Sequence, residues 1–101
     1  MFKQNQKCLV IIPETYPKAR DRQFKKVKNI VTITIDEDID YDYPITAFIE
    51  GLGELEFTLE GNYFKEPFDT YGYPSYINES DFPVLKHLTK TLRRKNDVWL
   101  H

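Results

Sequence analysis

Hydrophobic and polar residues alternate along much of this chain, which is the pattern of half-buried β-strands. The first apolar run, "KCLVII" at residues 7–12, is short enough for a central strand, and two nearby prolines end it. The clearest alternation is "NIVTITID" at residues 29–36. Val31, Ile33 and Ile35 are predicted to share one face of that strand, with the threonines between them on the other.

A β-hairpin is predicted in the middle of the chain. "PITAFIE" at 44–50 and "ELEFTLEGNYF" at 54–64 flank the connection "GLG", and two glycines in three residues favour a hairpin turn. In the second strand the apolar side chains are predicted to face inward and the polar ones outward. The inward set is Leu55, Phe57 and Leu59, and the outward set is Glu54, Glu56, Thr58 and Glu60.

The stretch "IDEDIDYDYP", residues 35–44, holds five carboxylates within seven positions. Its alternation predicts a strand or the entry to one, with a tight turn or a bulge at Asp36-Glu37. Ile39, Tyr41 and Tyr43 would lie on one face, and the carboxylates of Asp38, Asp40 and Asp42 would lie on the opposite face.

A helix is predicted near the C-terminus. Asn78, Ser80 or Asp81 can cap it, and Pro83 is tolerated in a first turn. Its apolar stripe would be Phe82, Leu85, Leu88 and Leu92, and its basic stripe Lys86, Lys90 and Arg93, extended by Arg94 and Lys95. Residues 65–80 are expected to form a long loop, and residues 18–28 a basic loop with one helical turn.

These elements predict a single α+β domain over residues 1–101. It would be a mostly antiparallel sheet of about four strands with one C-terminal helix packed on it. A chain of 101 residues with 15% aromatic residues is typical of a folded domain and not of disorder. No apolar run reaches the ~18–20 residues of a membrane span, and the N-terminus is a poor signal peptide. We therefore expect a soluble, cytoplasmic protein without a membrane partner.

The net charge of −2 conceals a strong segregation of charge. Residues 1–28 carry eight lysines and arginines against two acids, and residues 29–82 carry thirteen acids against one lysine. Residues 83–101 are again basic, with five lysines and arginines against one aspartate. Segregation of this kind indicates that the charged segments bind partners of opposite charge or pair with each other within the chain.

The acidic stretch does not match a calcium loop. An EF-hand loop requires a glycine at position 6 and a glutamate at position 12. Counted from Asp36, those positions hold Tyr41 and Ala47, and counted from Asp38 they hold Tyr43 and Ile49. An extended strand would also spread the carboxylates ~6.6 Å apart instead of converging them. No metal site and no cofactor are therefore predicted.

Catalytic chemistry finds little support in the sequence. Acid–base catalysis needs two carboxyl groups in different environments, and these acids share a solvated face. Cys8, the only cysteine, lies in an apolar strand and is predicted to be a buried structural thiol. His87 is expected on the helix surface, and the chain has no Walker loop, CxxC or HExxH motif. We therefore expect a protein that is not an enzyme.

The leading hypothesis is an interaction protein whose acidic sheet face binds a basic partner surface. Like charges on one face repel one another and destabilise the sheet. An acidic face without compensating positive charges is therefore expected to bind a basic partner. The predicted partner-binding residues are Asp36, Glu37, Asp38, Asp40, Asp42, Glu54, Glu56 and Glu60. In size and composition the chain is similar to small phage or mobile-element inhibitors that mimic DNA, which implies a nucleic-acid-binding protein as partner.

Two alternatives stay open. The acids could be covered by the chain's own basic loop and helix. Conversely, a small RNA- or DNA-binding accessory protein could use the basic loop 18–28 and the basic helix face. Its predicted contacts are Lys25, Lys26, Lys86, Lys90, Arg93 and Arg94. The oligomeric state is a further open point, because strand edges or the "VWL" tail could mediate a homodimer.

Overall fold

A computed structural model describes residues 1–38, 40–64 and 78–88 of the chain. Strand β1 spans Lys7–Ile11, β2 Lys28–Ile35, β3 Ile45–Ile49, β4 Gly53–Phe57 and β5 Val84–His87. One helical turn, α1 at Pro17–Asp21, lies between β1 and β2, and a 3-10 turn, η2 at Glu79–Asp81, precedes β5.

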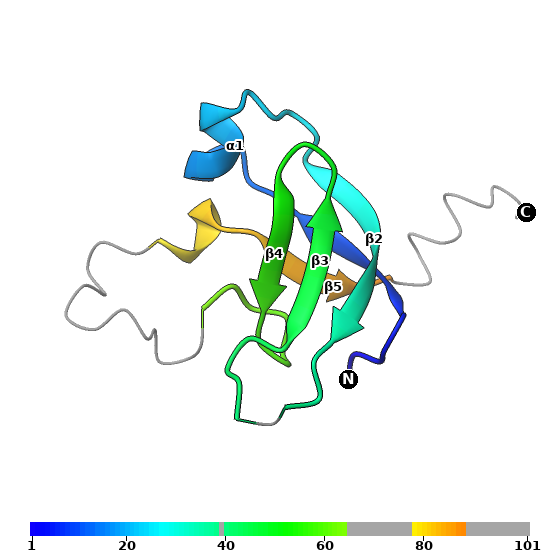
Figure 1. Ribbon diagram of the computed structural model, residues 1–101. Coiled ribbons are helices and arrows are strands. Elements are labelled where there is room, and N and C mark those ends of the chain that lie inside the picture. Colours follow the sequence, from blue (N-terminus) through cyan, green and yellow to red (C-terminus); the bar gives the residue numbers. More distant parts are fainter. Residues whose placement is uncertain (39, 65–77, 89–101) are drawn as a thin grey trace, which may run out of the picture.

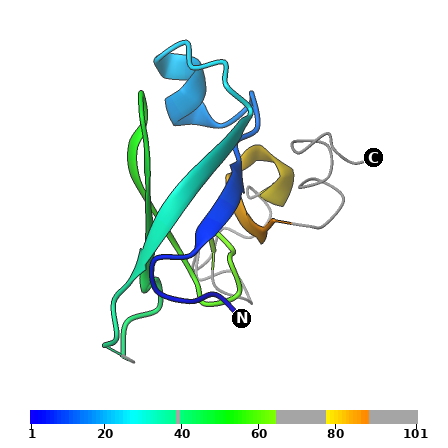
Figure 2. The ribbon, with the colours of Figure 1, turned by 90° about the vertical axis from the view of Figure 1, so that its right-hand side faces the viewer.

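The five strands form one antiparallel sheet in the order β4-β3-β2-β1-β5 (Figure 1). The long strand β2 pairs with β1 through its first half and with β3 through its second half. The sheet is curled (Figure 2). Its two ends approach each other after β4, where Asn62 bridges to Val84 and the Leu85 N–H donates to the Gly61 carbonyl at 2.9 Å.

The inner face of the curled sheet holds the hydrophobic core. Leu55 and Phe57 of β4 point inward as predicted and are almost completely buried. Val31, Ile33 and Ile35 of β2 share the inner face, where Ile33 is fully buried and the other two are partly buried. The core members are Phe2, Cys8, Val10, Ile12, Tyr16, Ala19, Ile33, Ile45, Ala47, Ile49, Leu52, Leu55, Phe57 and Leu85. The helical turn α1 contributes Ala19, so the basic segment it belongs to is anchored at one end of the sheet.

The β3–β4 hairpin is confirmed, with its turn at residues 50–52. Gly51 has φ +94°, a conformation that L side chains rarely adopt, and a Cβ there would lie 3.1 Å from the Phe24 ring. The Arg22 guanidinium donates to the Leu52 carbonyl at 2.9 Å. The hairpin tip is thus fastened to the α1–β2 connection.

The predicted C-terminal helix is wrong where the structure describes it, and with it the α+β fold class. Val84–His87 is an edge strand that pairs with β1, and the described chain is mostly a curled five-stranded sheet. Phe82 and Leu85 are three positions apart, a spacing that suits one face of a helix and not one face of a strand. The apolar run at residues 82–85 is itself too short for periodicity to decide between the two, so the predicted helix depended on Leu88 and Leu92 as well. Pro83 sits immediately before the strand, where its missing N–H removes no ladder bond. Leu92 and residues 89–101 lie outside the described residues.

Two predictions within the central region are also wrong. Residues 36–38 and 40–44 form a loop between β2 and β3 instead of a strand. The strand expected over 54–64 ends at Phe57, because Thr58 and Asn62 close a turn in which Thr58 N–H donates to the Asn62 carbonyl at 2.9 Å. The turn buries Thr58 and leaves Leu59 53% exposed, the reverse of the predicted orientation.

Candidate functional site

The acidic loop, residues 36–42, owes its shape to its own aspartates. The Asp36 carboxylate accepts the Asp38 N–H at 3.0 Å, and the Asp38 carboxylate accepts the Asp40 N–H at 3.1 Å. Aspartate favours turns through this kind of bond to the backbone two residues ahead. The Asp36 N–H donates to the Pro44 carbonyl at 2.8 Å, which closes the loop at its base. Two of the acids are therefore turn-forming residues as well as surface charges.

Tyr41 joins the acidic loop to the sheet. Its hydroxyl donates to the Glu56 carboxylate and lies 3.1 Å from each of the two carboxylate oxygens. This hydrogen bond raises the pKa of Tyr41, because ionisation would set a phenolate against a carboxylate. Glu56 points from the outer face of β4, opposite Thr46 of β3. The contact gathers the loop carboxylates and Glu56 at one end of the sheet.

The predicted partner-binding residues occupy three places. Asp36, Glu37, Asp38, Asp40 and Asp42 are exposed in the loop, and Glu54 and Glu56 are exposed on the outer face of β4. Glu60 is exposed in the turn after β4, outside the sheet face on which it was predicted. The Tyr41 hydroxyl joins Glu56 to the loop. We call the loop carboxylates together with Glu56 the acidic surface.

The basic residues of the alternative hypothesis lie elsewhere. Lys25 and Lys26 are exposed on the connection between α1 and β2, at the end of the sheet opposite to the acidic loop (Figures 1 and 2). The basic segment 18–28 therefore does not cover that loop. Lys86 is exposed on β5. Lys90, Arg93 and Arg94 lie outside the described residues, as do Ile39 of the acidic stretch and residues 65–77 of the predicted long loop.

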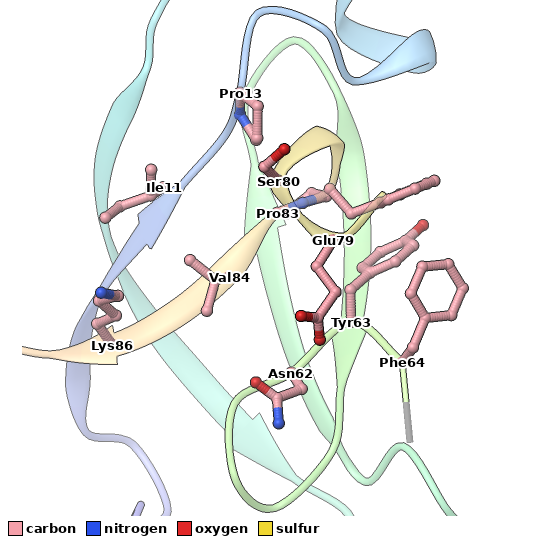
Figure 3. Close-up of a pocket in the computed structure, with 11 residues that line it drawn as sticks. Ile11, Pro13, Asn62, Tyr63, Phe64, Glu79, Ser80, Pro83, Val84 and Lys86 are labelled. Carbon is pink, nitrogen blue, oxygen red and sulfur yellow. The ribbon is translucent and has the colours of Figure 1, made fainter. Parts of the chain in front are cut away.

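A groove that sequence reasoning missed lies between the segment after β4 and the segment that leads into β5. Its volume is about 380 Å³, and its walls include Asn62, Tyr63, Phe64, Glu79 and Pro83. Figure 3 shows Glu79 directed towards Asn62 and the rings of Tyr63 and Phe64 beside each other. The pairs Tyr63-Phe64 and Phe82-Pro83 were the only sequence signal for it. No cysteine or histidine lines this groove, so its described lining lacks a thiol nucleophile and an imidazole base.

Cys8 and His87 lie next to each other in the β1–β5 register but do not form a catalytic arrangement. Cys8 is fully buried, and burial raises the pKa of its thiol, which disfavours the nucleophilic thiolate. The His87 ring stacks on Phe2, with ring centroids 4.1 Å apart. The Gln6 amide N–H donates to His87 Nδ1 at 2.9 Å, because Gln6 Oε1 already accepts the Lys3 N–H. His87 thus fastens the N-terminal segment to β5.

Ligating side chains do not converge in the described residues, where no group of three histidines, cysteines or carboxylates is placed to hold a metal ion. None of the helices described is long and apolar enough to cross a membrane. Comparison with known proteins gives no match to a family model, to a curated protein or to a solved structure.

Proposed function

We propose that this chain is a small non-enzymatic interaction protein whose acidic surface binds a basic surface of a partner protein. The observation that carries the proposal is the bond from Tyr41 to both oxygens of Glu56. It holds the loop carboxylates beside the sheet, so that exposed negative charges from two separate segments face the same end of the molecule. Complementary charge of this kind speeds association and selects the partner.

The partner class that fits is a nucleic-acid-binding protein. Duplex DNA carries one charge per ~1.7 Å of helix axis, and the proteins that bind it present lysine and arginine at matching density. The acidic surface offers several carboxylates within a few residues of one another. A protein with this surface can occupy such a cleft and exclude the nucleic acid.

Capture from a cell lysate, with the bound proteins identified by mass spectrometry, tests the proposal. The variant to use is Glu37→Lys with Asp40→Lys, because it reverses two exposed charges and spares the turn-forming carboxylates of Asp36 and Asp38. A matched control reverses Glu14 and Glu50, which are exposed in other connections. We expect the loop variant to lose a basic protein that wild type and control retain.

Competition with duplex DNA distinguishes a DNA mimic from a protein that binds its basic partner at another site. If duplex DNA displaces the captured protein, the chain acts as a DNA mimic. A partner that both variants capture equally well would contradict the acidic surface as the binding site. Salt-dependent binding of the chain itself to DNA would instead support the nucleic-acid-binding alternative.

A further inference from the structure

The outer face of the sheet, opposite the core, exposes two large apolar side chains. Phe48 of β3 is 63% exposed and Ile30 of β2 is 53% exposed. Their chain neighbours Ala47, Ile49 and Asn29 are buried on the inner face, so the strand alternation fixes Phe48 and Ile30 outward. Apolar side chains grouped on one face of a sheet mark a surface that contacts another molecule.

The strand register adds opposite charges at the two sides of this apolar centre. Glu54 of β4 lies opposite Phe48, and Lys7 of β1 lies opposite Thr32 of β2. The pairing of β2 with β3 ends at Ile33 and Ala47, and Thr32 and Phe48 are the residues that follow this pair on the outer face of the two strands. One row across four strands thus reads Glu54, Phe48, Thr32, Lys7, and all four side chains are exposed. The strand spacing of ~4.8 Å separates the two charges by roughly 14 Å.

This row is complementary to itself. A two-fold axis that runs parallel to the strands, in the plane between two facing sheets and midway between β2 and β3, exchanges the two ends of the row and turns the second sheet to face the first. The Glu54 carboxylate of one copy then lies over the Lys7 ammonium of the other, while Phe48 meets the middle of the opposing sheet. A two-fold interface requires this property, because the same patch must serve on both subunits. A partner of uniform charge would match only one end of the row.

We propose that the outer face of the sheet binds a second copy of this chain. In this dimer the two sheets pack face to face, with Phe48 and Ile30 at the centre and two Glu54–Lys7 pairs at the sides. The acidic loop joins the ends of β2 and β3 and lies outside the row, so it stays available to a partner. The inference is independent of the proposed function.

Charge exchange tests the dimer, with self-association measured by sedimentation equilibrium and light scattering. The single variants Glu54→Lys and Lys7→Glu each set like charges against each other in both pairs. We expect each to weaken self-association by at least about tenfold. An equimolar mixture of the two restores opposite charges in both pairs, so it is expected to form a heterodimer. Glu60→Lys makes the same charge change outside the row and is expected to dimerise like wild type.

A second variant, Phe48→Ser, removes the apolar centre and is expected to be monomeric. Far-ultraviolet circular dichroism checks that every variant keeps its sheet. Three results would overturn the proposal: a wild-type chain that stays monomeric at the highest concentration it tolerates in solution, charge-reversed variants that dimerise normally, and a mixture that fails to associate.

Discussion

The hydroxyl groups of Tyr16 and Tyr63 lie 2.9 Å apart and form a hydrogen bond that joins the segment before α1 to the segment after β4. The two rings meet edge to face, and both also contact the Phe82 ring. This aromatic cluster ties together parts of the chain that are far apart in sequence. It forms one wall of the groove shown in Figure 3 and connects that groove to the core.

Replacing Tyr16 with phenylalanine removes one hydroxyl and little volume. We expect Tyr16→Phe to lower the free energy of unfolding by about 0.5–1.5 kcal/mol, the usual contribution of one hydrogen bond. Urea denaturation followed by tryptophan fluorescence or circular dichroism measures the change. Tyr41→Phe, which removes an exposed hydroxyl, serves as a control and is expected to change stability less. An equal loss in both variants would contradict the structural role of the Tyr16–Tyr63 bond.

Burial, and then the bond to Tyr63, raises the pKa of Tyr16 above the ordinary value of 10.0. The folded state therefore favours the protonated phenol. The resulting stabilisation is fully present below the pKa of the unfolded chain and is lost as the pH rises through the folded pKa. We expect thermal stability to fall above about pH 10, and less steeply in Tyr16→Phe. A pH series of melting curves on both proteins checks this, and identical slopes would contradict it.

Cys8 is predicted to be protected from thiol reagents in the native state. The side chain is fully buried, its pKa is raised by burial, and it lies in the core between β2 and β5. A colorimetric disulfide reagent should therefore react with it only when the sheet opens, and much faster in denaturant. Rapid labelling of the native protein, at the rate of a free peptide thiol, would show that β5 detaches readily from β1.

Gly61 and Gly53 form a matched pair for testing the closure of the sheet. Both have positive φ, +89° and +95°, so alanine is strained at either position. At Gly61 the added Cβ would lie 2.5 Å from the Leu85 carbonyl oxygen, whereas at Gly53 no atom lies within 4 Å. We expect Gly53→Ala to cost about 1–2 kcal/mol of stability. Gly61→Ala should cost clearly more, measured by urea denaturation, and equal losses would contradict the bridge to β5.

Leu85 and Leu59 test the corrected C-terminal region. Leu85 is 2% exposed on β5, and Leu59 is 53% exposed in the turn after β4. We expect Leu85→Ala to destabilise the protein by roughly 2–5 kcal/mol, because it leaves a cavity in the core. Leu59→Ala is expected to change stability by less than about 0.5 kcal/mol. The reverse order, measured by thermal melting, would favour the orientations that the sequence alone predicted.

Local patterns were sufficient to predict the strands that are packed on one face and bounded by clear breaks. The alternation around Ile33 and the two glycines of the hairpin each specified their element without help from distant residues. The prediction for the C-terminal region failed because the apolar run at residues 82–85 is too short for periodicity to decide between a helix and a strand. Residues 84–87 form a strand because they pair with β1 and because the Leu85 N–H donates to the Gly61 carbonyl. Both partners lie far from this segment in the sequence, so its local pattern does not reveal them.

The acidic residues also show that a local sequence pattern does not identify contacts with distant residues. Their composition was evident, but the alternation around Asp38 was mistaken for a strand because aspartate also forms turns with its own backbone. Tyr41 was expected to lie on a sheet face beside Tyr43. Its actual partner, Glu56, is fifteen residues away, and the pairing of β4 with β3 sets Glu56 near the end of the sheet where the loop enters β3. Grouping of the charges was predictable, whereas the contact that holds them was not.

α1 and the acidic loop lie at opposite ends of the sheet. The described part of the molecule therefore has an electric dipole moment in addition to its net charge. Six exposed lysines and arginines lie along 18–28 at one end, and the loop carboxylates lie at the other. In an external electrostatic field such a molecule turns before it makes contact. An approaching basic surface would meet it loop first, and a polyanion would meet it α1 first, so orientation is selected before any side chain touches.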